Sequence, residues 1–140
     1  MPEVTFLVVD DDEIDVELLH RAFAKLKIAN PVVRASDGIE ALEILRGTGG
    51  KAKLKPPYII LLDINMPRMS GLEFLEELRQ DEELRLSVVF ILTTSDDERD
   101  IVKSYEKCVS GYVVKSQVGK SFEEALKMLN HFWRVVELPH

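Results

Sequence analysis

Cysteine is nearly absent from this chain, because Cys108 is the single cysteine among 140 residues and cannot close an internal disulfide. Long hydrophobic runs are missing too, and the longest apolar stretches fall far below the ~20 residues that a membrane span requires. The N-terminus lacks the charged segment and apolar core of a secretory signal. These absences predict a cytoplasmic protein with no membrane contact, in which Cys108 is a small buried residue.

Basic charge is also in short supply. The chain has 18 Lys and Arg against 25 Asp and Glu, a formal net charge of -7. Because nucleic-acid binding draws on clustered Lys and Arg, we expect no nucleic-acid partner. The one basic cluster, Lys51, Lys53 and Lys55, lies in the Gly-rich and Pro-rich stretch 47–57, which is typical of a solvated loop. The acidity instead favours protein partners or bound cations.

Short apolar runs, bounded by turn or acidic residues, indicate buried parallel strands because they lack the alternation of a half-exposed sheet. Four are clear and a fifth is weaker. The clear runs cover residues 6–9, 58–62, 88–92 and 112–114, and the weaker one covers 32–35. Since 46% of the residues are hydrophobic, we expect one globular domain over residues 1–140, with no separate output domain.

Segments with helical spacing separate the strands. The apolar positions are Ile14, Leu18, Ala22 and Leu26, then Ile39, Leu42 and Leu45, then Leu72, Leu75 and Leu78, with a last helix over 121–137. Strand and helix therefore alternate, which predicts a doubly wound α/β domain, a five-stranded parallel sheet with helices on both faces. The apolar residues Phe132, Trp133 and Leu138 exceed what such a sheet covers, so we expect a dimer contact there.

Chemically reactive side chains stand where the predicted strands end. Asp10, Asp11 and Asp12 follow the first strand, Asp63 the third, Thr93 and Thr94 the fourth, and Lys115 the fifth. In a parallel sheet these ends meet at one edge, where a doubly wound domain binds ligands. Asp12 is expected to be a helix N-cap instead of a ligand.

Carboxylates gathered so closely repel one another unless a cation or a lysine offsets their charge. Mg²⁺ prefers oxygen ligands and often takes one or two carboxylates together with a phosphate oxygen. Asp10, Asp11, Asp63 and a loop carbonyl would form such a site, with Lys115 nearby. Asp63 could then attack an incoming phosphoryl group, and the Thr93 hydroxyl could bond one of its oxygens.

At these residues the sequence resembles the receiver domains of two-component response regulators. The matching segments run from Phe6 to Asp12, from Leu62 to Gly71, from Ile91 to Thr94 and from Gly111 to Lys115. The resemblance implies a flavodoxin-like fold with strand order 2-1-3-4-5. It also implies a phosphoacceptor switch that is no enzyme beyond its own phosphorylation and dephosphorylation, and that receives its phosphoryl group from a histidine kinase in a Mg²⁺-dependent reaction.

The resemblance assigns a role to each site residue. It makes Asp63 the phosphoacceptor, Asp10 and Asp11 the acidic pair for the metal, Asn65 a ligand through its backbone carbonyl, Lys115 the phosphate-binding lysine, Thr93 and Tyr112 the switch pair, and Asn65 and Ser95 the residues that tune phosphate lifetime. The resemblance also implies a switch mechanism in which Thr93 moves toward the phosphoryl group and the Tyr112 ring turns inward, which remodels the face of the fourth helix, fifth strand and fifth helix.

One position departs from the family pattern, because Ser116 follows Lys115 where most receivers have a proline in a cis peptide. A cis bond before serine costs about 3–4 kcal/mol. Either the site carries that strain, or the bond is trans and Lys115 approaches the site differently.

The finer resemblance is to single-domain regulators paired with bacterial phytochrome kinases. The segments that carry it are the 47–57 loop, Thr94-Ser95, Lys115-Ser116, Phe132-Trp133 and Leu138-Pro139. It implies a bacteriophytochrome as the kinase and a homodimer through the face of the fourth helix, fifth strand and fifth helix.

Other functions remain open. A phosphorelay intermediate or a phosphate sink would use the same residues, and a receiver that docks without phosphorylation is also conceivable. An aspartyl-nucleophile phosphatase of the haloacid-dehalogenase type would need a second Asp where Asn65 stands. A flavodoxin-like electron carrier would need a phosphate-binding loop where Asp10 to Asp12 repel phosphate.

Overall fold

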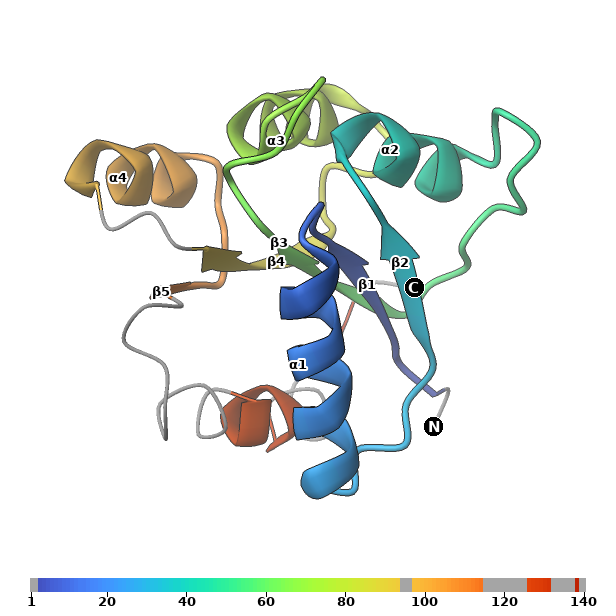
Figure 1. Ribbon diagram of the computed structural model, residues 1–140. Helices are drawn as coiled ribbons and strands as arrows, with labels where there is room; N and C mark the ends of the chain where they lie inside the picture. The colour runs from blue at the N-terminus through green and yellow to red at the C-terminus, as the bar shows by residue number, and fades with distance from the viewer. Residues whose placement is uncertain (1–2, 94–96, 115–125, 132–137, 139–140) are drawn as a thin grey trace.

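A five-stranded parallel sheet forms the centre of the computed structural model, which describes residues 3–93, 97–114, 126–131 and 138 (Figure 1). The strand order is β2-β1-β3-β4-β5. The strands are β1 (Thr5–Val9), β2 (Val32–Ala35), β3 (Tyr58–Leu62), β4 (Val88–Thr93) and β5 (Gly111–Val114). The helices are α1 (Glu13–Lys25), α2 (Gly38–Arg46), α3 (Gly71–Gln80) and α4 (Glu98–Glu106), and residues 126–131 are also helical. The expected fold class and strand order are confirmed.

Both faces of the sheet are covered, which explains why its strands are continuous apolar runs. Successive side chains point to opposite faces, so Leu7 and Ile60 pack with α2 and α3, whereas Phe6 and Ile59 pack with α1 and residues 126–131. Figure 1 shows α2 and α3 on one side of the sheet and α1 on the other. Two apolar layers therefore fix the sheet between them.

Each labelled helix begins at a residue that caps its free N–H groups. The caps are Asp12 for α1, Asp37 for α2, Ser70 for α3 and Asp97 for α4. Such a cap typically stabilises a helix by about 1 kcal/mol. The expectation that Asp12 is an N-cap is confirmed, since its carboxylate accepts from the backbone N–H of Ile14 at 2.9 Å.

The predicted core stripe of α1 is partly wrong. Ile14 is 71% exposed and Leu18 is 50% exposed, while Val16, Leu19 and Phe23 are buried against the sheet. The segment has apolar residues on more than one side, so spacing alone did not decide which side faces inward. The side of α1 that includes Leu19 is the one that packs against the sheet.

The C-terminal segment covers the sheet as expected at Leu126 and Leu129, which are both buried. Leu138 is buried in the same apolar layer, so its expected place in a dimer contact is wrong. Phe132 and Trp133 lie outside the described residues. Among the described helices, none is long and apolar enough to cross a membrane.

The loop regions confirm one expectation and correct another. Lys51, Lys53 and Lys55 are exposed, as predicted for a solvated loop. Cys108, expected to be buried, is exposed in the turn after α4, with a backbone φ of 61°. The turn to β5 requires this left-handed conformation, which carries the thiol away from the core.

Candidate functional site

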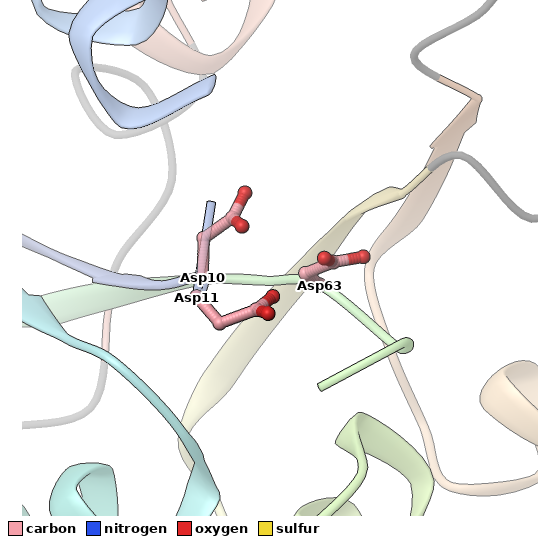
Figure 2. Close-up of side chains that lie close together, drawn as sticks. All are labelled: Asp10, Asp11 and Asp63. Carbon is pink, nitrogen blue, oxygen red and sulfur yellow. The ribbon is translucent and has the colours of Figure 1, made fainter. Parts of the chain in front are cut away.

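Three carboxylates meet at the carboxyl edge of the sheet. Asp10 and Asp11 directly follow β1, and Asp63 directly follows β3, the neighbouring strand (Figure 2). One oxygen from each residue lies within 4.8 Å of the others. Asp10 and Asp63 are only 6% and 7% exposed, whereas Asp11 is exposed. The structure thus brings together the acidic residues that the sequence placed at separate strand ends.

Backbone hydrogen bonds continue the sheet as far as these acids. The Asp63 N–H donates to the Val9 carbonyl at 2.9 Å, and the Asp10 N–H donates to the Ala35 carbonyl at 3.1 Å. The carboxylate of Asp10 also accepts from the Asp12 N–H at 2.9 Å. Asp10 and Asp63 are therefore set by the strand pairing, and they stand in a pocket with little freedom to separate.

Arg34 supplies positive charge beside this cluster. It lies on β2, and its guanidinium donates to the backbone carbonyl of Asp10 at 3.2 Å. This contact could not be predicted from the sequence, because a single arginine in a short strand has no distinguishing pattern. The contact supports the turn that carries Asp10 and Asp11.

The loop from β3 to α3 closes tightly behind Asp63. The Gly71 N–H donates to the Ile64 carbonyl at 2.8 Å, and a Cβ at Gly71 would lie 2.3 Å from the Asp63 carbonyl oxygen. Only glycine permits this approach. Asn65, the expected carbonyl ligand, is exposed within the closed loop.

Thr93 and Tyr112 lie on neighbouring strands and on the same face of the sheet. Tyr112 of β5 pairs with Ile91 of β4, and Thr93 is two residues beyond Ile91. Thr93 is fully buried, and Tyr112 is half-buried against the apolar layer on the α2 and α3 side. The structure therefore brings the expected switch pair close together. Lys115, Ser95 and Ser116 lie outside the described residues.

The comparisons with known proteins agree with this geometry. Residues 6–127 match the family model of the response regulator receiver domain. The chain belongs to this family. The receiver is 32% identical over 139 residues to the response regulator Rcp1 of Synechocystis sp. (strain ATCC 27184 / PCC 6803 / Kazusa), covering 99% of this chain and 95% of Rcp1.

Solved receivers have the same fold. The Mn²⁺-bound form of Rcp1 matches with a TM-score of 0.85 at 33% identity, covering 99% of this chain and 100% of that chain. The phosphorylated cyanobacterial phytochrome response regulator RcpA matches with 0.86 at 35% identity over the whole of both chains. The bacteriophytochrome response regulator AtBRR matches with 0.77 at 38% identity, covering 97% and 99%. The receiver is accordingly a phosphoacceptor switch of two-component signalling.

Proposed function

We propose that Asp63 is the residue that accepts the phosphoryl group, and that Asp10, Asp11, Asp63 and the backbone carbonyl of Asn65 hold Mg²⁺. The observation that supports this most directly is the meeting of three carboxylates from two strands within 4.8 Å. Hard oxygen ligands at this density suit a divalent cation. The Mn²⁺-bound relative Rcp1 supports a divalent metal in this kind of site.

A bound Mg²⁺ would offset the negative charge of the cluster and of the incoming phosphoryl oxygens. Asp63 contributes the nucleophile: one carboxylate oxygen forms a bond to phosphorus while the bond from phosphorus to the donor histidine nitrogen breaks. The product is an acyl phosphate on Asp63, and the imidazole leaves with the electron pair of the broken bond. Asp10 and Asp63 are buried and held by the sheet, so positioning supplies much of the catalysis.

The remaining site residues act on the phosphoryl group once it is bound. Lys115 pairs with a phosphoryl oxygen, and Asn65 and Ser95 flank the group and set its lifetime. Thr93 donates its hydroxyl to a phosphoryl oxygen, and Tyr112 then turns into the space that Thr93 leaves. Support for this pair is their adjacency on one face of β4 and β5.

The donor that we propose is a histidine kinase of the bacteriophytochrome type, because several matching structures are phytochrome response regulators. We also propose a homodimer through α4, β5 and the C-terminal helix. Val102 and Tyr105 support it, since both are about half exposed on α4. We propose that the receiver acts through such protein contacts in the cytoplasm.

The test is Mg²⁺-dependent labelling by a small acyl phosphate, with intact mass measured for each variant. We expect Asp63→Asn to take up no label, and we expect Asp11→Asn to lose most of the labelling that Mg²⁺ stimulates. Asp12→Asn is the matched control, because it removes a neighbouring charge while asparagine still caps α1. Equal labelling of Asp63→Asn and wild type would refute the assignment.

A further inference from the structure

An ion pair with one buried member ties the turn before α2 to the loop after Asp63. Asp37 and Arg68 are its two members, and the Arg68 Nε and Nη2 atoms lie 2.7 Å and 2.6 Å from Asp37 Oδ2. The Asp37 side chain is 8% exposed and the Arg68 side chain 59%. The pair therefore has one fixed, buried end and one end carried by the loop.

Asp37 is held in place independently of Arg68. Its Oδ1 accepts from the Glu40 N–H at 2.9 Å and so caps α2, which leaves Oδ2 directed at the guanidinium. A carboxylate this buried needs a positive partner, because its water has been removed. Asp37 is thus a rigid anchor for Arg68.

The loop backbone at Arg68 is strained. Arg68 has a φ of 62°, and the Met69 N–H donates to the Pro67 carbonyl at 2.7 Å. This is the rare γ-turn with positive φ at its centre, which a residue other than glycine adopts at a cost. Such a conformation persists only where the surroundings impose it, and the ion pair is a contact that does so.

Close packing supports the same part of the loop. A Cβ at Gly38, the first residue of α2, would lie 2.8 Å from Cγ of Met69. The absence of that atom lets Met69 sit directly against the helix start. Arg68 and Met69 therefore contact Asp37 and Gly38 at the start of α2. The hydrogen bond from the Gly71 N–H to the Ile64 carbonyl closes the base of the same loop.

We propose that Arg68, anchored by Asp37, is a positioning residue for the metal site. It holds the β3–α3 loop so that the Asn65 backbone carbonyl faces the ion bound by Asp10, Asp11 and Asp63. This inference rests on the proposed function for the identity of the ligands. The ion pair lies outside the set of metal ligands. Contacts of this kind orient the residues that bind the metal directly in other metal sites.

The test measures Mn²⁺ affinity of the unphosphorylated protein by electron paramagnetic resonance of free Mn²⁺. We expect Arg68→Met and Asp37→Asn each to weaken binding by roughly 10-fold, the lower end of outer-contact effects. Asparagine keeps the cap of α2, so Asp37→Asn removes the charge alone. The double variant should be no weaker than either single one, because both remove one interaction. Arg68→Lys should restore part of the affinity.

Amide hydrogen exchange reports the loop directly. In Arg68→Met we expect faster exchange at Met69 and Gly71, with α1 and the central strands unchanged. Arg46→Met is the matched control, because it breaks another ion pair of α2, to Asp81 at 3.1 Å, away from the loop. This control should leave Mn²⁺ affinity at the wild-type value.

A second substitution separates the ion pair from general folding effects. Arg68→Gly accepts a positive φ without strain, so the loop keeps its conformational preference while the ion pair is lost. If Arg68→Gly and Asp37→Asn both bind Mn²⁺ as tightly as wild type, the inference is overturned. Asp11→Asn distinguishes the two proposals: if it also binds Mn²⁺ normally, the metal site itself is wrong, and if it fails to bind, only the role of Arg68 is wrong.

Discussion

The hydroxyl groups of Tyr58 and Ser87 lie 2.7 Å apart, at the end of the sheet opposite the acidic cluster. Tyr58 begins β3, and Ser87 directly precedes β4. Burial raises the pKa of the Tyr58 hydroxyl above its ordinary value near 10.0, against a smaller opposite effect of the hydrogen bond with Ser87. The neutral phenol is therefore favoured in the folded protein.

This shift predicts a loss of stability in alkali. A raised folded-state pKa means that the contribution of Tyr58 is complete below the unfolded pKa and is lost as pH rises through the folded pKa. Tyr58→Phe should cost about 0.5–1.5 kcal/mol near neutral pH and should flatten the alkaline decline. Urea unfolding at about pH 7.5 and about pH 11 measures both effects. An alkaline decline equally steep in both proteins would contradict the shift.

The buried and exposed sides of α1 should differ sharply in their effect on stability. Leu19→Ala removes a side chain that is 4% exposed, so we expect a loss of about 2–5 kcal/mol. Ile14→Ala truncates a side chain that is 71% exposed, and we expect a change within about 0.5 kcal/mol. Chemical denaturation of both variants provides the measurement. Comparable losses would mean that the helix presents a different face.

Arg79 joins the connection that precedes β4 to the connection between α4 and β5. Its guanidinium donates to the carbonyls of Arg85 and Ser87 before the strand, each at 2.7 Å, and to those of Lys107 at 2.7 Å and Cys108 at 3.1 Å after α4. Burial lowers the pKa of Arg79, yet a guanidinium remains charged at neutral pH.

Removing these four bonds should destabilise the protein and loosen α4. We expect Arg79→Met to cost roughly 2–4 kcal/mol and to speed hydrogen exchange in α4, in which Ser104 is the buried residue. Arg79→Lys should recover little, because one ammonium cannot reach both connections. Arg21→Met, which breaks the exposed pair with Glu17, is the control and should change neither quantity. Unchanged hydrogen exchange in α4 of Arg79→Met would show that other contacts hold the helix.

Metal binding should raise the free energy of unfolding. If the acidic cluster binds Mg²⁺ only when folded, Mg²⁺ at about 100 times its dissociation constant adds about 2.7 kcal/mol. Without Mg²⁺, Asp63→Asn should be more stable than wild type by roughly 1 kcal/mol, because it removes one of three repelling charges. Thermal melts with Mg²⁺ and with a chelator test both statements. A wild-type melting temperature that is the same with Mg²⁺ and with a chelator would count against the metal site.

Much of the fold could be predicted because parallel strands buried on both sides leave an unambiguous apolar signal. The run 58–62 coincides with β3, and 32–35 coincides with β2. The meeting of Asp10, Asp11 and Asp63 followed from the same reasoning, since strand ends in a parallel sheet share one edge.

The features that the sequence did not predict depend on contacts that leave no local pattern in it. The inward side of α1 is chosen by the sheet, so Ile14 could not be distinguished from Leu19 by spacing. Cys108 is exposed because its turn needs a left-handed backbone, which composition does not reveal. The contacts of Arg68 and Arg79 join segments about 30 residues apart, and single arginines in loops and helix ends resemble ordinary surface residues.

The order of the strands has a consequence for synthesis of the chain. β1 is the strand between β2 and β3, and Val9 pairs with Leu62 on one side and Ala35 on the other. At roughly 5–20 residues per second, several seconds separate the translation of Val9 from that of Leu62. During this interval one edge of a largely apolar strand stays open, so we expect the nascent protein to depend on chaperones until β3 has emerged from the ribosome.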